Sequence, residues 1–300
     1  MDLTLKLRSL TLANPVGVAS GTFGYAKEYD GLVDFRRIGA VYTKAVTPEP
    51  RAGNPSPRLA ETPAGMLNSI GLANVGLRAF AAEKMPFLRT IPSAVIVNVA
   101  GARDRDYDEV VEALDAVEGV DAFEINVSCP NVEHGGMSLG TDPALVAALT
   151  RSLRGRTDKP LIIKLSPNVT DIGAAAEAAE AAGADAVSCV NTFVGMVIDL
   201  AAKKPQLPLG TGGLSGPAIL PLAVAAVHKV SRRVRIPVIG VGGITKWEDA
   251  VQHLLAGASA VQIGSGTFAN PRLAQEVHDG ILAWAWEEGV TSVADFHAFG

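Results

Sequence analysis

Polar residues follow the short apolar runs of this sequence, at the point where each run ends. They are Ser20, Lys44, Asn98, Asn126, Lys164, Asn191 with Thr192, Gly242 with Gly243, and Gly264 with Ser265. An ammonium group at the end of an apolar strand is costly to bury unless an anion meets it. The two lysines therefore predict an anionic ligand, while a structural salt bridge is the alternative for either lysine alone.

The last two of these positions differ in kind, because they offer glycines and backbone N–H groups. The runs "GVGGI" and "IGSGT" are typical of the phosphate cradle of barrel enzymes, although glycine turns after strands also arise for geometric reasons. Together with the two lysines and the asparagines at 68, 98, 126 and 191, they predict a pocket for an anionic ring system rich in amide groups. A flavin mononucleotide (FMN) beside a small carboxylated heterocycle suits this inventory, and so does a sugar phosphate.

The two cysteines lie in different surroundings. Cys189, inside "AVSCV", is interpreted as a small buried side chain. Cys129 lies past a strand end, before Pro130, on the glycine-rich loop "NVEHGGMSLGTDP". A thiol there could act as a base or nucleophile if neighbours assist its ionisation, and the residues alone leave this open against a packing role. His134 in the same loop is interpreted as a solvated side chain.

The elements that would position these residues alternate along the chain. Eight β-branched runs predict parallel strands covered on both faces. They begin near Val16, Val41, Val95, Phe123, Leu161, Ala186, Pro237 and Ala260. Eight strands with helical crossovers predict an α/β fold, a (β/α)₈ TIM barrel with long Gly/Pro-rich loops at its C-terminal face, in one domain spanning 1–300.

Three of the crossover helices have recognisable ends. Asp142 is placed as an N-cap with Pro143 as the first helical residue. A second helix is predicted from Thr170 to a C-cap at Gly183, and a third starts with a capping box that pairs Thr245 with Glu248. Two gaps between strands, 46–93 and 192–237, are about twice the usual length, which favours ligand sites or lids over plain surface insertions.

Composition excludes several classes of protein. The net charge is −5 without a basic stretch, so no nucleic-acid partner is expected. The start lacks a signal-peptide pattern and no run is long enough to span a bilayer, so we expect a cytoplasmic protein without membrane contact. Two cysteines are too few for a disulfide framework or a four-cysteine cluster, and the five histidines lack ligand spacing, so no metal site is expected.

An ordered set of motifs covers nearly the whole chain. It comprises "PVGVASGTFG", "TKAVTPEPRAGNPSPRL", "MLNSIGLANVG", "NVSCPN", "IIKLSPNVTD", "VNTFVGMVID", "GGLSGPAI", "IPVIGVGGI" and "VQIGSGTF". The set closely resembles the class 1 dihydroorotate dehydrogenases, although each glycine-rich piece alone is weak. The resemblance implies a flavin-binding barrel that oxidises (S)-dihydroorotate to orotate in pyrimidine synthesis. The class 2 enzymes differ, because they use serine where this chain has Cys129.

The resemblance also implies residue roles. By its position in the motif, Cys129 resembles the general base of the family, which removes the C5 proton of dihydroorotate while hydride passes from C6 to N5 of FMN. The residues that resemble the substrate clamp are Lys44, Asn68, Ser69, Ile70, Gly71, Leu72, Asn126, Asn191 and Thr192. The residues that match cofactor contacts are Ser20, Lys44, Ala45, Asn98, Asn126, Lys164, Val190, Gly216, Gly242, Gly243, Gly264 and Ser265.

Within class 1, "NVEHGG" and "LGTDP" resemble the 1B branch. That branch implies one FMN on this chain and a separate subunit that carries FAD and a 2Fe–2S cluster and passes electrons to NAD⁺, in a heterotetramer of two chains of each kind. Leu139 departs from the phenylalanine expected before the loop glycine, which bears on loop packing.

Four alternatives to this function stay open. They are a fumarate-linked 1A enzyme, a subunit like dihydropyrimidine dehydrogenase, a flavin-free barrel acting on a phosphorylated sugar, and an inactive flavin-binding scaffold. The sugar-phosphate hypothesis leaves Cys129 and the long 46–93 segment without a role, and an intact set of Cys129, Lys44 and Asn68 argues against the scaffold.

Overall fold

Eight parallel strands close into a barrel in the computed structural model, which describes residues 2–128 and 139–297. The strands are β3 (Val16–Val18), β4 (Ala40–Tyr42), β7 (Ala94–Val99), β8 (Ala122–Asn126), β9 (Leu161–Lys164), β10 (Ala186–Cys189), β15 (Val238–Val241) and β16 (Ala260–Ile263). They pair in chain order, and β16 pairs with β3 to close the ring. All eight are the predicted strands, so the predicted fold class is confirmed.

Side chains alternate between the inside and the outside of the barrel, because successive residues of a strand point to opposite faces. Tyr42, Ile96 and Ile162 belong to a cluster inside the barrel. Val97 and Ile163 belong to the larger cluster between the strands and the helices. Both faces of the barrel sheet are therefore shielded from water, which explains why the strands are continuous apolar runs.

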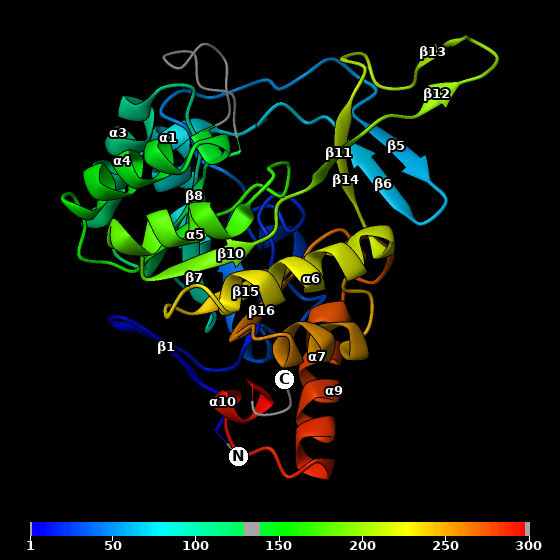
Figure 1. Cartoon of the computed structure of the whole chain (residues 1–300). Helices are drawn as coiled ribbons and strands as arrows, with labels where there is room; N and C mark the ends of the chain where they lie inside the picture. The colour runs from blue at the N-terminus through cyan, green and yellow to red at the C-terminus, as the bar shows by residue number, and fades with distance from the viewer. Residues whose placement is uncertain (1, 129–138, 298–300) are drawn as a thin grey trace.

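Helices cover the outside of the barrel (Figure 1). The longer ones are α3 (Asp104–Asp115), α4 (Pro143–Arg154), α5 (Ile172–Ala181), α6 (Leu220–Ser231), α7 (Trp247–Leu255) and α9 (Leu273–Glu287). The short ones are α1 (Gly76–Ala79), α2 (Met85–Leu88), α8 (Gly266–Ala269) and α10 (Val293–Phe296), besides single turns at Lys27–Tyr29, Phe35–Arg37, Phe80–Lys84, Leu139–Thr141 and Pro217–Ile219. Among the described residues no helix is long and apolar enough to cross a bilayer.

One of the three predicted helix starts is confirmed. The Asp142 carboxylate accepts a hydrogen bond from the Ala144 backbone N–H (2.8 Å), which caps α4. The second helix, α5, begins at Ile172 and not at the predicted Thr170, and its N-cap is Asp171, whose carboxylate accepts from the Gly173 N–H (3.2 Å). The C-terminal end of α5 also differs, because its C-cap is Ala182, and the predicted C-cap Gly183 follows it with φ +100°.

The capping box predicted for α7 is wrong. The side chain that caps the start of α7 is Asp249, not Glu248. Its carboxylate accepts hydrogen bonds from the Thr245 N–H (2.9 Å), the Thr245 hydroxyl (2.8 Å) and the Lys246 N–H (3.2 Å). Because α7 begins at Trp247, its third residue is Asp249 and not Glu248.

The two long connections pair with each other to form an arm over the barrel. The arm consists of β5 (Leu59–Thr62), β6 (Gly65–Asn68), β11 (Phe193–Gly195) and β14 (Gly212–Ser215), an antiparallel sheet in the order β11-β14-β6-β5, extended by the hairpin of β12 (Ile198–Asp199) and β13 (Lys204–Pro205). Figure 1 shows the arm at one end of the barrel and β1 (Leu5–Leu7) towards the other.

The hairpin of β1 and β2 (Leu10–Leu12) contributes to the apolar interior of the barrel. Leu5, Leu7 and Leu12 belong to the same buried cluster as Ile96 and Ile239. This apolar packing lies away from the arm, which leaves the carboxyl ends of the strands as the place for polar side chains.

Candidate active site

A cavity of about 760 Å³ lies at the carboxyl ends of the barrel strands, bordered by the arm. It lies in the size range of small-molecule and cofactor sites, about 300–1,000 Å³. All the predicted site residues that the structure describes line it. They are Ser20, Lys44, Ala45, Asn68, Ser69, Ile70, Gly71, Leu72, Asn98, Asn126, Lys164, Val190, Asn191, Thr192, Gly216, Gly242, Gly243, Gly264 and Ser265. Cys129 and His134 lie outside the described residues, so their predicted roles stay predictions.

Three buried residues form what we call the cavity floor: Asn98 and Lys164, which line the cavity, and Glu124 beneath them. The Lys164 ammonium lies 3.4 Å from the Glu124 carboxylate. The salt-bridge alternative therefore holds for Lys164, and the same side chain also lines the cavity. Glu124 was not predicted, although a lone acidic residue in the apolar run "AFEIN" was a visible signal.

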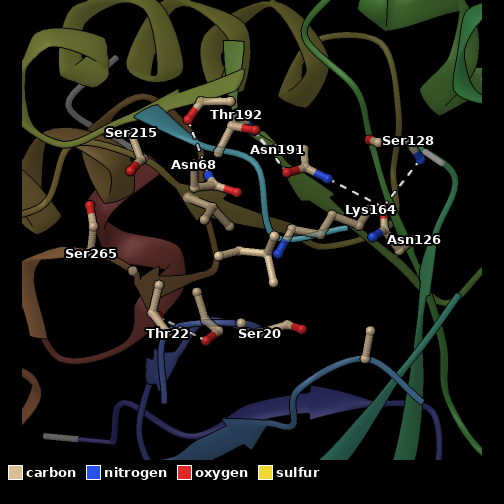
Figure 2. Close-up of a pocket in the computed structure, with 18 of the residues that line it drawn as sticks. Ser20, Thr22, Asn68, Asn126, Ser128, Lys164, Asn191, Thr192, Ser215 and Ser265 are labelled. Carbon is tan, nitrogen blue, oxygen red and sulfur yellow. Dashed lines mark hydrogen bonds between the residues drawn. The ribbon is translucent and has the colours of Figure 1, made fainter. Parts of the chain in front are cut away.

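Amide side chains form one wall of the cavity. Asn126 Oδ1 accepts hydrogen bonds from Asn191 Nδ2 (3.2 Å) and from the Ser128 backbone N–H (3.1 Å). Asn191 Oδ1 in turn accepts from the Thr192 N–H (2.8 Å). Figure 2 shows these side chains facing the same space as Lys164 and Asn68. Their mutual bonds fix the amide orientations in advance of any ligand.

Lys44 differs from Lys164 in having no carboxylate within 4.0 Å in the described part of the chain. Burial lowers the pKa of its ammonium, the positive charge of Arg58 lowers it further, and Glu28 opposes both. A cation that is partly desolvated beside another cation is stabilised by a bound anion. The side chain therefore suits the carboxylate of a ligand.

The arm supplies the outer wall. Asn68 Nδ2 donates to the Gly213 carbonyl (3.1 Å), which joins β6 to β14. Asn54 Nδ2 donates to the Ser69 hydroxyl oxygen (3.0 Å), which braces the segment after β6. Gly213 and Ser215 also line the cavity and were not predicted, because β14 is a glycine-rich strand of four residues with no alternating pattern.

After β15 and β16, three glycines form what we call the glycine rim: Gly242, Gly243 and Gly264. Gly243 has φ +80°, and a Cβ there would lie 2.5 Å from the Leu220 backbone nitrogen. Gly264 has an ordinary φ, and a Cβ there would meet only the Ala19 methyl, at 3.9 Å. The rim can thus bring backbone N–H groups close to an anion, as a phosphate requires.

His253 supports the glycine rim from inside the protein. It is fully buried, and its Nε2 lies 3.0 Å from the Gly242 carbonyl oxygen. Because a carbonyl only accepts, Nε2 carries the proton. Burial lowers the pKa of His253 to about 4, so the ring is neutral at pH 7.

The residues present fit an FMN. Asn98 Oδ1 is buried and has no hydrogen-bond partner among the described residues, so it can accept from an N–H of a ring. Lys164 offers donors beside it, and the glycine rim suits a phosphate. Within the described residues no group of three or more His, Cys, Asp or Glu could hold a metal ion.

Cys189 is buried in the core, as predicted, and burial raises the pKa of its thiol. A thiol of this kind stays protonated and inert at neutral pH.

Comparison with known proteins gives a consistent result. The dihydroorotate dehydrogenase family model matches residues 2–284. Two curated relatives are each described as a dihydroorotate dehydrogenase B (NAD(+)), catalytic subunit. The one from Pelobacter propionicus is 51% identical over 98% of this chain and 97% of its own, and the one from Trichlorobacter lovleyi is 50% identical over 97% and 96%.

A solved structure of a dihydroorotate dehydrogenase from Eimeria tenella, in complex with ferulenol, is also similar. It has a TM-score of 0.80 at 22% identity and covers 98% of this chain and 87% of its own. At that identity the likeness shows a shared fold.

Proposed function

This chain belongs to the dihydroorotate dehydrogenase family as a catalytic subunit of the NAD⁺-linked 1B type, which serves pyrimidine biosynthesis, and we propose how its residues divide the reaction. The chain acts as a single domain, residues 1–300, in the cytoplasm, and holds one FMN. The observation that carries the proposal is that all the described residues predicted for substrate and cofactor line one cavity.

The substrate is bound by residues of the arm and by the wall of amide side chains around Asn126 and Asn191. Asn68 with Ser69, Ile70, Gly71 and Leu72 comes from β6 and the segment after it, Asn126 ends β8, Asn191 and Thr192 follow β10, and all of them line the cavity. Amide groups and hydroxyls of fixed orientation suit a ring with alternating N–H and C=O groups. The Lys44 ammonium, which lacks a carboxylate partner in the described chain, binds the carboxylate of dihydroorotate.

Cys129 removes the C5 proton of dihydroorotate. A C–H bond beside a carbonyl is a weak acid, so its base must be close and shielded from water. A bound FMN would supply, at its N5 position, the acceptor for the hydride that leaves C6. Lys164 and Asn98 on the cavity floor would hold the flavin ring, together with Ala45 and Val190.

The phosphate of the cofactor is bound mainly by backbone groups. The glycine rim, with Ser20, Gly216 and Ser265, binds the ribityl chain and the phosphate. This arrangement gives the anion N–H donors without adding bulk.

Electrons leave through a partner subunit that carries FAD and a 2Fe–2S cluster and reduces NAD⁺, in a heterotetramer with two chains of each kind. Two cysteines in the chain are too few to ligate such a cluster alone. The arm exposes large apolar side chains that do not line the cavity, with Leu200 85%, Met196 51% and Ile198 46% exposed. Such a group of apolar side chains supports a chain that works within an assembly.

Anaerobic titration of the purified, FMN-loaded chain with dihydroorotate tests cofactor, substrate and reaction at once. We expect the chain to hold about one FMN, and we expect the absorbance of this flavin to bleach as dihydroorotate is added. A chain that takes up no FMN, or one whose flavin is reduced by dihydrouracil as fast as by dihydroorotate, would contradict the proposal.

Cys129→Ser tests the base, because a serine hydroxyl is a far weaker acid than a thiol. We expect unchanged FMN binding and a flavin reduction rate lower by orders of magnitude at neutral pH. Reduction at the wild-type rate in a single turnover would remove Cys129 from the mechanism.

The 1B assignment has its own test. Co-purification from the native host should bring down a flavin and iron–sulfur partner, and rapid fumarate reduction by the chain alone would point to the 1A type instead.

A further inference from the structure

Glu124 is a charged side chain at the centre of the barrel. It lies in β8, two residues before Asn126, and is 0% exposed. Its neighbours Phe123 and Ile125 belong to the outer cluster, and Ala122 belongs to the inner one. Strand alternation therefore directs the Glu124 carboxylate into the barrel, beneath the cavity.

Donors from four other strands meet the two oxygens of this carboxylate. Oε1 accepts from Asn98 Nδ2 (2.7 Å) and faces the Lys164 ammonium (3.4 Å). Oε2 accepts from the Ser188 hydroxyl (2.7 Å) and from Gln262 Nε2 (2.7 Å). Each oxygen of the Glu124 side chain thus faces two neighbouring donor groups, which is the environment that an acceptor-only carboxylate requires.

The carboxylate decides how Asn98 presents its amide. Because Nδ2 is committed to Glu124, the oxygen is the free end, and Asn98 Oδ1 is a buried acceptor without a partner among the described residues. The Lys164 ammonium, which has three N–H donors, contacts Glu124 Oε1, the same oxygen that accepts from Asn98. The cavity floor thus offers one acceptor and one cation whose positions are both fixed from below.

The same contact sets the net charge of the floor. One positive and one negative group 3.4 Å apart sum to zero. Glu124 reduces the electrostatic field that Lys164 exerts on a ring bound above the floor. The anionic form of a reduced flavin is therefore stabilised less than it would be by Lys164 alone.

We propose that Glu124 is a positioning residue that holds Lys164 and Asn98 at the cavity and limits how strongly the floor favours reduced over oxidised flavin. This inference rests on the proposed function, since it takes the ring to be FMN. It assigns the balance of the two flavin states to a residue that does not line the cavity.

Glu124→Gln tests the charge while keeping the shape. The Gln262 amide can rotate to match the new side chain, which preserves the network. We expect the ratio of affinities for reduced and oxidised FMN to rise at least about tenfold, a midpoint potential about 30 mV more positive for the two-electron couple. The potential is measured by slow anaerobic reduction beside a reference dye, and the oxidised affinity by flavin fluorescence.

Two matched variants separate charge from structure. Glu124→Asp keeps the charge, and Ser188→Ala removes one donor to Glu124 without touching the cavity lining. Both should lower the melting temperature while leaving the affinity ratio within about threefold of wild type. An unchanged ratio in Glu124→Gln, or an equal change in all three variants, would overturn the proposal.

A second comparison holds if Glu124→Gln alone fails to fold. Lys164→Met and the double variant Glu124→Gln/Lys164→Met differ only in the carboxylate, and the double variant has no unpaired buried charge. The affinity ratio should be at least about tenfold higher in the double variant, and equal ratios would reject the proposal. A wild-type chain that binds no FMN would reject the proposed function, whereas a wild-type chain that binds FMN with equal ratios in these pairs rejects only this inference.

Discussion

The cavity floor and the glycine rim face the same cavity but are built from opposite materials. The floor consists of side chains that are held by the hydrogen bonds they donate to the Glu124 carboxylate. The rim consists of backbone whose close approach to Leu220 leaves no space for a side chain at Gly243. A substitution in the floor therefore changes charge at constant shape, whereas a substitution in the rim changes shape at constant charge.

The largest effect is expected from Gly243→Ala in the rim. A methyl group there would overlap the Leu220 backbone, at 2.5 Å from its nitrogen, on a residue with φ +80°. The left-handed conformation costs about 1–2 kcal/mol and the overlap about 1–3 more. We expect a loss of roughly 2–5 kcal/mol in the free energy of unfolding, measured by urea denaturation, together with loss of FMN.

Gly264→Ala is the matched control. Its methyl group would meet only Ala19, at 3.9 Å, without a strained φ. The free energy of unfolding should change by less than about 0.5 kcal/mol, as for an ordinary tolerated substitution. If both glycine variants lost the same stability, the rim would not be shaped by close backbone approach.

The next effect concerns Lys44, on the side of the barrel between rim and floor. Lys44→Met removes a cation but keeps its length, and hydrogen bonds to charged groups contribute about 1.5–3 kcal/mol. The dissociation constant for orotate, followed by the flavin spectrum, should rise roughly ten- to hundredfold while FMN stays bound. An unchanged orotate affinity would exclude Lys44 from carboxylate binding.

The pH dependence of orotate binding should agree with this. Because burial lowers the pKa of Lys44, orotate affinity in the wild type should fall at a lower pH than for a solvated lysine. In Lys44→Met that alkaline decrease should be absent.

The effect that is smallest at neutral pH, and grows only in acid, comes from His253 behind the rim. Its pKa in the folded chain is about 4, below the ordinary 6.5, so the unfolded chain binds a proton that the folded chain refuses between these values. Stability should therefore be complete above pH 6.5 and fall as the pH drops towards 4, by at most about 1.4 kcal/mol per unit.

His253→Gln serves as its control, because a glutamine amide can donate to the Gly242 carbonyl without titrating in this range. The melting temperature of this variant should fall less between pH 6.5 and 4 than that of wild type. Parallel curves for the two proteins would remove His253 from the acid response.

The two regions also differ in how far sequence could predict them. The eight strands were predicted correctly, because continuous apolar runs that end in Lys, Asn or Gly are typical of the parallel strands of a barrel, and the residues that follow them line one cavity. Glu124 was missed since a single polar residue inside a strand gives no periodic signal, and only the closed barrel brings Asn98, Ser188 and Gln262 around it.

The arm was missed for a related reason. Its strands have two to four residues and pair across two distant connections, so neither connection has the pattern of a strand by itself. The wrong capping box of α7 reflects a shift by one residue between Glu248 and Asp249, a distinction that only the helix start decides.

The pairing of the arm has a consequence for how the protein is made. Asn68 and Gly213, which join its two halves, are 145 positions apart in the chain. While the chain leaves the ribosome, β6 can pair with β5, but its second neighbour β14 is synthesised much later, and the barrel closes only when β16 has been made and pairs with β3. A nascent chain that stalls before β14 has most of the barrel strands but no complete substrate wall, so truncated products of this kind cannot bind substrate productively.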